Sequence, residues 1–138
     1  MAVYLVRHGE SVANKALVLS GSCDHPLTDA GRAQARQAGR KLIGVPIVRV
    51  FTSVLERAVE TAEIILGEAG LAPQSWIRDR RLNERDFGIY EDVAQSWISA
   101  NHGPDVLQRV HTDVAFRDRK STRLNSSHTD ISRMPSSA

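Results

Sequence analysis

Short apolar segments alternate with helix-patterned segments along the chain, and this alternation restricts the fold more than any other feature of the sequence. Residues 2–6, 47–51 and 75–78 are short runs with the apolar, β-branched or aromatic residues that favour strands. Helices are expected between and after them, at residues 10–18, 29–43, 53–69 and 93–100. Strands that alternate with helices are typical of a parallel sheet covered by crossover helices, so the sequence predicts an α/β fold.

Local signals predict how two of these helices begin. Thr28 stands immediately before residues 29–43 and has the side chain of a good N-cap. Ser53 and Glu56 have the spacing of a capping box, in which a hydroxyl and a carboxylate satisfy backbone N–H groups of the first turn. The apolar residues that follow have helical spacing and leave Arg57 outside their stripe. We therefore expect a helix capped by Ser53, with Arg57 off its buried face.

The charge balance gives no reason to expect a polyanionic partner. The chain has 18 basic and 16 acidic residues, a net charge of +2. Four of the basic and two of the acidic residues lie in residues 118–138, which leaves 14 of each sign in residues 1–117. A neutral body lacks the basic surface that nucleic acids attract, so we expect no nucleic-acid partner.

Length and composition indicate one globular domain at most, since 138 residues with 41% hydrophobic and 25% charged side chains are ordinary for such a domain. No apolar run is long enough to span a bilayer, so no membrane contact is expected. The single cysteine, Cys23, cannot form an internal disulfide or a cysteine-based metal site. This cysteine usage suits the reducing cytoplasm, and we predict a cytoplasmic protein.

Residues 118–138 differ in composition from the rest of the chain. They are rich in serine, poor in apolar residues and without a helical or strand period. Translation of a common sequencing-library adapter reproduces residues 118–128 without a mismatch. We therefore interpret residues 118–138 as a non-native, disordered tail. Residues 1–117 are then the N-terminal part of a domain that continues in the natural protein.

Charged side chains gather where the three predicted strands end. Arg7, His8 and Gly9 follow the first strand, residues 52–57 follow the second, and residues 82–85 come after the third. In parallel α/β sheets, ligands bind beyond the carboxyl ends of the strands. We therefore expect these three segments to meet in one pocket.

The residue types in these segments suit phosphoryl transfer through a histidine. A neutral His8 imidazole can attack phosphorus and hold the phosphoryl group covalently. The guanidinium groups of Arg7 and Arg57 match phosphate oxygens in geometry and charge. Backbone N–H groups of the helix after Gly9 are expected to extend this phosphate cradle. Glu84 is the candidate acid that protonates the leaving oxygen.

Four ordered segments resemble the motifs of the histidine phosphatase superfamily, which includes the cofactor-dependent phosphoglycerate mutases. They are residues 5–11 with Asn14, residues 27–35, residues 51–58 with Thr61, and residues 82–88. The resemblance implies an α/β three-layer sandwich with a mostly parallel sheet, truncated here on its C-terminal side. It also implies an enzyme that acts on a small phosphorylated substrate.

The same resemblance assigns roles to individual residues. His8 is the phosphorylated nucleophile and Glu84 the proton donor. The residues assigned to phosphate or substrate binding are Arg7, Ser11, Asn14, Ser20, Gly21, Arg57 and Arg85. No metal and no bound cofactor are implied, and 2,3-bisphosphoglycerate would serve only as the primer of a mutase.

The sequence also departs from the pattern of the superfamily. Neither His102 nor His111 fits the second catalytic histidine, which lies late in the chain after a buried strand. We expect that residue to be missing with the C-terminal part, so the 138-residue chain should have little turnover. Gln95 stands where mutases carry a lysine, and their later arginine pair has no match near Val110.

These departures order the possible functions. Hydrolysis of a small phosphomonoester is the first choice, because the cations that hold the second charged end of a phosphoglycerate are absent. A 2,3-bisphosphoglycerate-dependent phosphoglycerate mutase is the alternative, since residues 82–85 are closer to the corresponding sequence motif of the mutases. An inactive phosphate-binding fragment is the third. The oligomeric state is left open, with a dimer among the options.

Overall fold

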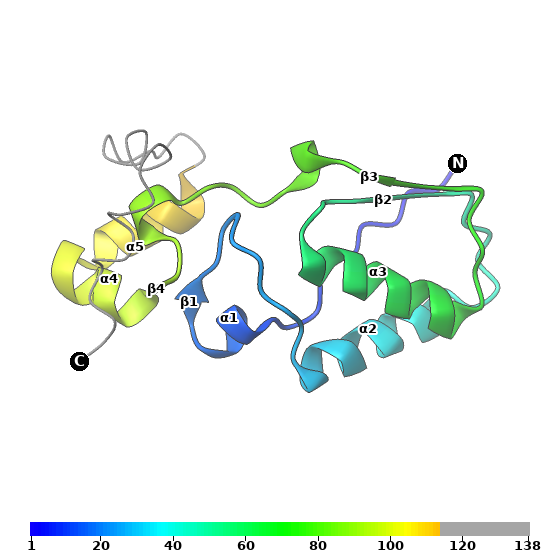
Figure 1. The fold of residues 1–138 in the computed structure, drawn as a ribbon, viewed down its shortest axis with the longest axis horizontal. Coiled ribbons are helices and arrows are strands. Elements are labelled where there is room, and N and C mark those ends of the chain that lie inside the picture. Colours follow the sequence, from blue (N-terminus) through cyan, green and yellow to red (C-terminus); the bar gives the residue numbers. More distant parts are fainter. Residues whose placement is uncertain (114–138) are drawn as a thin grey trace. The chain divides into compact units, whose positions relative to one another are not determined.

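The computed structural model describes residues 1–113, which form two compact units. Within the described residues, the first unit contains residues 1–15 and 24–83, and the second contains residues 16–23 and 84–113 (Figure 1). The second unit therefore combines one short early segment with the last 30 described residues. The predicted tail at residues 118–138 lies outside the described residues.

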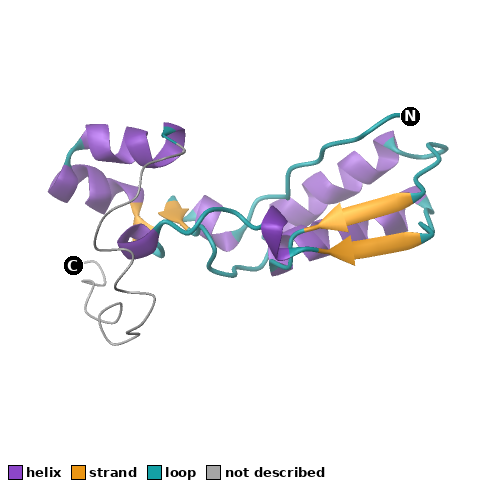
Figure 2. Ribbon diagram, turned by 90° about the horizontal axis from the view of Figure 1, so that it is seen from above, coloured by secondary structure: helices purple, strands orange, loops and turns teal. Residues whose placement is uncertain are grey.

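A parallel pair of strands, β2 (Arg49–Thr52) and β3 (Ser75–Arg78), forms the sheet of the first unit. Figure 2 shows the two strands side by side. Parallel pairing requires a crossover, and α3 (Glu56–Ala69) provides it. The predicted strand–helix–strand order is thus confirmed for this part of the chain. Strand β3 has its predicted bounds, while β2 begins at Arg49 and not at Ile47.

The second long helix of this unit, α2 (Asp29–Lys41), lies alongside α3 (Figure 1). The two helices approach closely at Gly39, where a Cβ atom would lie 2.9 Å from the carbonyl oxygen of Ile65. Two salt bridges also join the pair, Arg32–Glu60 and Arg40–Glu68. The absence of a side chain at Gly39 therefore helps to set the spacing of the two helices.

The two predicted helix starts have different outcomes. Thr28 is the N-cap of α2, and its hydroxyl accepts a hydrogen bond from the Gly31 N–H at 3.0 Å, as predicted. The capping box predicted at Ser53 is wrong, because α3 begins only at Glu56. The Asp24 carboxylate accepts the hydrogen bond from the Glu56 N–H instead, at 2.7 Å. A loop residue distant in sequence thus caps this helix.

The buried face of α3 also differs from the predicted one. Its buried residues are Arg57, Thr61 and Ile65, which follow one another at intervals of four and share one face. Arg57 is only 2% exposed, so the prediction that it lies off the buried face is wrong. Apolar patterning treats arginine as a surface residue, and it therefore misses a buried face that is partly polar.

The N-terminal apolar run at residues 2–6 is not a strand. Val3 and Leu5 are 75% and 95% exposed. The prediction of a buried strand is wrong here because a strand forms by pairing, and none of the strands in residues 1–113 pairs with this run. The helix predicted at residues 10–18 is also shorter than expected. It is α1 (Val12–Lys15), after which the backbone turns at Leu17 with a positive φ of 55°.

The second unit has a small antiparallel sheet, in which β1 (Val18–Leu19) pairs with β4 (Val93–Ala94). A single 3-10 turn, Gly88–Tyr90, precedes β4, and a similar turn at Arg80–Leu82 follows β3 in the first unit. Backbone hydrogen bonds from Asp92 N–H to Leu19 and from Gln95 N–H to Leu17 extend the pairing of β1 and β4. The sheet therefore ties the early segment of this unit to its C-terminal part.

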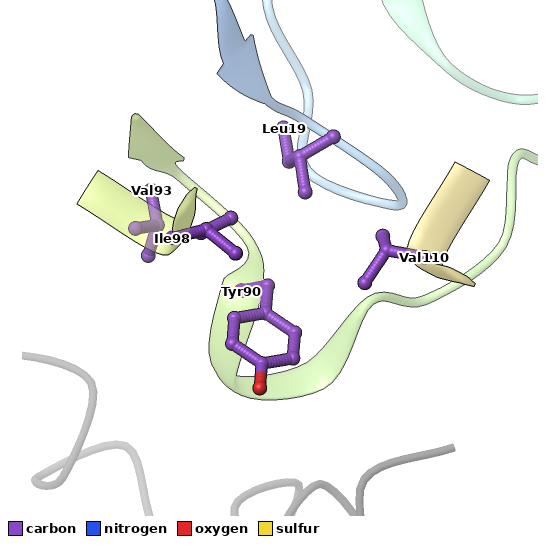
Figure 3. Close-up of a cluster of buried hydrophobic side chains, with 5 residues drawn as sticks. All are labelled: Leu19, Tyr90, Val93, Ile98 and Val110. Atoms are coloured by element: carbon purple, nitrogen blue, oxygen red, sulfur yellow. The ribbon is translucent and has the colours of Figure 1, made fainter. Parts of the chain in front are cut away.

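Two helices complete the second unit, α4 (Gln95–His102) and α5 (Pro104–Thr112). Helix α4 begins later than the predicted residues 93–100, because residues 93–94 form β4. Figure 3 shows the buried apolar side chains around which the unit packs, Leu19, Tyr90, Val93, Ile98 and Val110. Among the helices of residues 1–113, none combines the length and the apolar character needed to cross a membrane.

Residues 1–113 are thus an α/β chain, as predicted, but they do not form the predicted three-layer sandwich with a mostly parallel sheet. They contain one parallel and one antiparallel pair of strands. A larger parallel sheet needs further strands beside β2 and β3. Residues 2–6, which were expected to supply one, are unpaired in the described part of the chain.

Candidate functional site

His8 is half-buried, and its ring is held by the residue that follows it. The Nδ1 atom of His8 lies 2.7 Å from the Gly9 carbonyl oxygen. Because a carbonyl oxygen can only accept, this contact places the proton of the neutral ring on Nδ1 and the lone pair on Nε2. This contact therefore favours the neutral tautomer in which Nε2 is the unprotonated ring nitrogen.

Gly9 connects His8 to helix α3. The Gly9 N–H donates to the Thr61 hydroxyl at 3.1 Å, and that hydroxyl donates to the Arg57 carbonyl oxygen at 2.6 Å. A side chain at Gly9 would collide with the carbonyl oxygen of Gly31, so the backbone of this segment lies directly against α2. The first unit thus brings the His8 segment to the helix that carries Arg57.

The backbone N–H groups that directly follow His8 are engaged within the protein. Four successive N–H groups already donate within the protein: Gly9 to Thr61, Glu10 to Gln34, Ser11 to Asn14 and Val12 to Pro26. Buried backbone donors need such partners, and here protein oxygens supply all of them. These four groups are therefore engaged within the protein, and phosphate binding by backbone N–H groups of α1 stays a prediction.

Ser11 and Asn14 form a reciprocal cap on α1. The Ser11 N–H and hydroxyl donate to Asn14 Oδ1 at 3.0 and 2.9 Å, and the Asn14 N–H donates to Ser11 Oγ at 3.2 Å. This is the hydrogen-bond pattern of a capping box. It occupies the carbonyl oxygen of the Asn14 side chain and fixes the direction of its amide group.

The two predicted phosphate-binding arginines of the first unit differ in environment. Arg57 lies in the first turn of α3 and is buried, whereas Arg7 is exposed. Burial confines the Arg57 side chain, and the Thr61 hydrogen bond joins its backbone to Gly9. A half-buried histidine and a buried guanidinium on connected segments can bind an anionic ligand.

Glu84 and Arg85 belong to the second unit. Glu84 is exposed, and its carboxylate accepts a hydrogen bond from the Arg85 N–H at 3.0 Å. The Arg85 guanidinium donates to the carbonyl oxygens of Val110 and Asp113, at 2.5 and 2.8 Å, where helix α5 ends. Arg85 therefore caps the C-terminus of α5. The pairing of Glu84 with His8, which lies in the other unit, stays a prediction.

The predicted substrate loop around Ser20 and Gly21 is also in the second unit. The Ser20 carbonyl oxygen accepts from the Cys23 N–H at 2.8 Å, which closes a tight turn. Gly21 has a positive φ of 49°, and a side chain there would collide with the Glu91 carboxylate. Only glycine fits this position without strain.

Glu91 is the anchor of this loop, and the sequence did not single it out. Its Oε1 atom accepts from the N–H and the hydroxyl of Ser22 at 2.6 and 2.8 Å, and its Oε2 atom accepts from the Cys23 thiol at 3.3 Å. Burial and the negative charge of Glu91 raise the pKa of the Cys23 thiol to about 12. Cys23 is therefore a protonated, unreactive thiol at neutral pH.

Glu91 was thus missed altogether by sequence reasoning, and Thr61 was named only as part of a motif, without its contact to Gly9. Thr61 had a usable signal, because it lies one helical turn after Arg57 on the same face. Glu91 had none, since its partners Ser22 and Cys23 are distant in sequence. Among the described residues, no group of three or more His, Cys, Asp or Glu side chains is placed to hold a metal ion.

Comparison with protein families gives a specific match. A family model described as "Histidine phosphatase superfamily (branch 1)" matches residues 3–129. The chain belongs to this superfamily, as its motifs predicted. The α/β fold of the described residues agrees with this membership.

Individual relatives include both mutases and phosphatases. The chain is 36% identical, over 113 residues, to 2,3-bisphosphoglycerate-dependent phosphoglycerate mutase 2 of Gloeobacter violaceus, covering 82% of this chain and 52% of the mutase. It is 45% identical, over 92 residues, to fructose-2,6-bisphosphatase TIGAR B of Danio rerio, covering 65% of this chain and 36% of that protein. The chain spans about half the length of the curated mutases that it matches.

Solved structures show the same kinship. Bacillus stearothermophilus YhfR matches with a TM-score of 0.69 and 27% identity, over 94% of this chain and 67% of that one. A mycobacterial glucosyl-3-phosphoglycerate phosphatase in complex with VO3 matches with a TM-score of 0.63 and 28% identity, over 74% of this chain and 50% of that one. These neighbours share the α/β fold.

Proposed function

We propose that the protein to which this chain belongs transfers phosphoryl groups through a phosphohistidine at His8 and hydrolyses a small phosphomonoester. The observation that carries the proposal is the 2.7 Å contact between His8 Nδ1 and the Gly9 carbonyl oxygen. It leaves the lone pair of the neutral ring on Nε2, as attack on phosphorus requires. Membership of the histidine phosphatase superfamily supports the same assignment.

The proposed reaction has two steps. His8 Nε2 attacks the phosphorus atom of the substrate, the bond from phosphorus to the ester oxygen breaks, and the Glu84 carboxylic acid protonates the leaving oxygen. In the second step the Glu84 carboxylate takes a proton from water, and the water oxygen displaces histidine from phosphorus. Inorganic phosphate leaves, and both side chains regain their starting protonation.

Side chains supply the proposed phosphate contacts. Arg57 and Arg7 neutralise the phosphate, and the burial of Arg57 means that little side-chain entropy is lost when it binds. Asn14 contributes the donors of its amide group, because its carbonyl oxygen is engaged by Ser11. Ser11 is fully buried, so we assign its influence on the phosphate to its contacts with Asn14.

Three residues of the second unit are assigned to the substrate in this proposal. Ser20 and Gly21 border the part of the substrate beyond the phosphate, in a loop held by Glu91. Arg85 is assigned to the same substrate, and its guanidinium also caps α5. A loop built around one carboxylate offers a defined surface for recognition.

Phosphoglycerate mutase activity is the alternative, and a specific observation favours it. Several of the relatives are named 2,3-bisphosphoglycerate-dependent phosphoglycerate mutases. Such an activity would use 2,3-bisphosphoglycerate as a primer that phosphorylates His8. One residue argues against mutase activity. Gln95 lies at the start of α4, at the position where the resemblance to the mutases implies a lysine.

One experiment separates these activities. The full-length protein from the source gene is incubated with 3-phosphoglycerate, with and without 2,3-bisphosphoglycerate, and both phosphate and 2-phosphoglycerate are measured. Release of phosphate without isomer supports the hydrolase, whereas rapid isomer formation supports the mutase. An acid-labile phosphoryl group on His8 is expected in both cases, and its absence contradicts the proposal as a whole.

We propose that the 138-residue chain is itself inactive, and that it retains only phosphate binding. It spans about half of the mutases that it matches, and neither His102 nor His111 fits the second catalytic histidine. The three-layer sandwich is likewise proposed for the complete domain, with further strands beside β2 and β3. Phosphatase activity of the purified chain that is lost in His8→Ala contradicts this proposal.

The boundary at residue 117 is also a proposal. The adapter-like sequence of residues 118–128 supports this boundary, while the family match extends to residue 129. Reading the source DNA across codon 117 tests it. A gene that diverges from the adapter sequence after this codon agrees with the boundary, and a genomic match through residue 138 removes it.

Location and partners follow from the same assignment. A cytoplasmic location agrees with the single cysteine, and a small phosphorylated metabolite is the proposed substrate. The balanced charge of residues 1–117 supports the absence of a nucleic-acid partner. Light scattering on the full-length protein decides between a monomer and a dimer.

A further inference from the structure

The Thr61 hydroxyl joins two segments that are far apart in sequence. It donates to the Arg57 carbonyl oxygen at 2.6 Å and accepts from the Gly9 N–H at 3.1 Å. The first bond is common for threonine inside a helix. The second bond is not a local helix contact, since its donor is the N–H of Gly9, the residue that follows His8. Thr61 is only 5% exposed, so both bonds are shielded from water.

Gly9 needs external anchors because glycine restricts its own backbone less than any other residue. Two side chains hold the peptide groups on either side of it. Thr61 binds the N–H of the His8–Gly9 peptide, and Gln34 Oε1 binds the N–H of the Gly9–Glu10 peptide at 2.9 Å. The carbonyl oxygen of this second peptide is the acceptor for His8 Nδ1. The orientation of the ring therefore depends on anchors outside the His8 segment.

We propose that Thr61 is a positioning residue for His8. By binding the Gly9 N–H, it holds the Gly9 backbone, and the Gly9 carbonyl oxygen then selects the Nδ1-protonated tautomer of His8. The same hydroxyl joins this segment to the backbone of Arg57, so the His8 segment is held at a fixed position against helix α3. The inference rests on the proposed function in one respect, namely that Nε2 of His8 is the atom that accepts the phosphoryl group.

Three substitutions separate positioning from general stability. Thr61→Val keeps the shape of the side chain and removes the hydroxyl, whereas Thr61→Ser keeps the hydroxyl. Thr52→Val is the matched control, because Thr52 is also buried in the first unit and its hydroxyl accepts from the Trp76 indole N–H at 2.9 Å. The control loses a comparable hydrogen bond that does not reach Gly9.

The readout is the tautomer of His8 in the full 138-residue chain, measured from the ¹⁵N shifts of its two ring nitrogens in the neutral form, with His8→Ala to assign them. Wild type, Thr61→Ser and Thr52→Val are expected to show a protonated Nδ1 and an unprotonated Nε2. Thr61→Val is expected to lose this single tautomer, with both shifts moving towards average values. Retention of the wild-type tautomer in Thr61→Val, or the same loss in Thr52→Val, overturns the proposal.

Hydrogen exchange at the Gly9 amide gives a second measurement, which tests the proposal on the wild-type chain even where Thr61→Val does not fold. We expect slow exchange in the wild-type chain and in Thr61→Ser, and exchange about tenfold faster or more in a folded Thr61→Val. Fast exchange of Gly9 in the wild-type chain overturns the proposal. Neither measurement requires turnover, so a full-length protein that never forms phosphohistidine contradicts the proposed function and leaves the role of Thr61 to be decided by these readouts.

Discussion

The Asp24 carboxylate accepts a hydrogen bond from the Glu56 backbone N–H at 2.7 Å. This contact satisfies one of the N–H groups that the first turn of α3 leaves without an intrahelical partner. It also places a negative charge at the positive end of the helix. Because Arg57 and Thr61 lie on α3, Asp24 supports the element that carries part of the candidate site.

Replacing Asp24 should therefore destabilise the first unit. We expect Asp24→Ala to lower the free energy of unfolding by about 1 kcal/mol, as for other lost N-caps, and Asp24→Asn to lower it by less. Denaturant titration followed by circular dichroism measures both. Glu56→Gln is the matched control, since it changes the side chain but keeps the backbone N–H that donates to Asp24. Equal losses in Asp24→Ala and Glu56→Gln would show that the cap is not the cause.

The raised pKa of Cys23 predicts a slow thiol. With a pKa of about 12, compared with 9.0 for an ordinary thiol, the thiolate fraction at pH 8 falls by roughly two to three orders of magnitude. Alkylation by iodoacetamide should be slower by a similar factor in the folded chain than in urea. Glu91→Gln removes the nearby charge and should speed up alkylation of the folded chain. Equal rates in the folded and unfolded chains contradict the prediction.

The same pKa sets a direction for stability at high pH. Between about pH 9 and pH 12 the unfolded chain loses the Cys23 proton while the folded chain keeps it. The contribution of the protonated thiol is therefore complete below pH 9 and is lost as the pH rises towards 12. Unfolding midpoints measured from pH 8 to pH 11 should fall more steeply in wild type than in Cys23→Ser.

Gly31 and Gly67 are two helical glycines that differ in how closely the rest of the protein packs against them. A Cβ atom at Gly31 would collide with the carbonyl oxygen of Glu10, whereas at Gly67 nothing lies within 4 Å. We expect Gly31→Ala to destabilise the chain by about 1–3 kcal/mol, as overpacking does, and to disturb the hydrogen bonds of Glu10. Gly67→Ala should stabilise it by up to about 1 kcal/mol. Thermal unfolding of both variants measures the contrast, and a stabilising Gly31→Ala would show that α2 does not pack there.

The proposed acid predicts a dependence on the leaving group. In the full-length protein we expect Glu84→Gln to slow the hydrolysis of alkyl phosphates by about 10²–10⁴-fold, because their leaving oxygen needs a proton. Hydrolysis of a nitrophenyl phosphate, whose leaving group needs no proton, should slow far less. Phosphate release from both substrates, with His8→Ala as the inactive control, measures the difference. An equal loss on both substrates removes Glu84 from the role of acid.

Several elements were predictable because their signals are local. Thr28 carries both the hydroxyl and the position of an N-cap, and the Gly31 N–H that it binds is only three residues away. Strand β3 and the stop of α3 at Gly70, which has a left-handed backbone, are encoded in the same local way. The capping box at Ser53 failed because a contact from Asp24 competes with it, and a window of a few residues does not contain that partner.

The sequence by itself determined which chemical groups are available and in what order. The His8-Gly9 pair, the arginines, Glu84 and the α/β alternation can all be read from it, since residue type and local period carry that information. The tertiary structure alone decided that Arg57 is buried, that Thr61 holds Gly9 and that Glu91 anchors the loop at Ser22. The physical reason is that hydrogen bonds between distant segments depend on how helices and loops pack, and such packing leaves no periodic trace in the sequence.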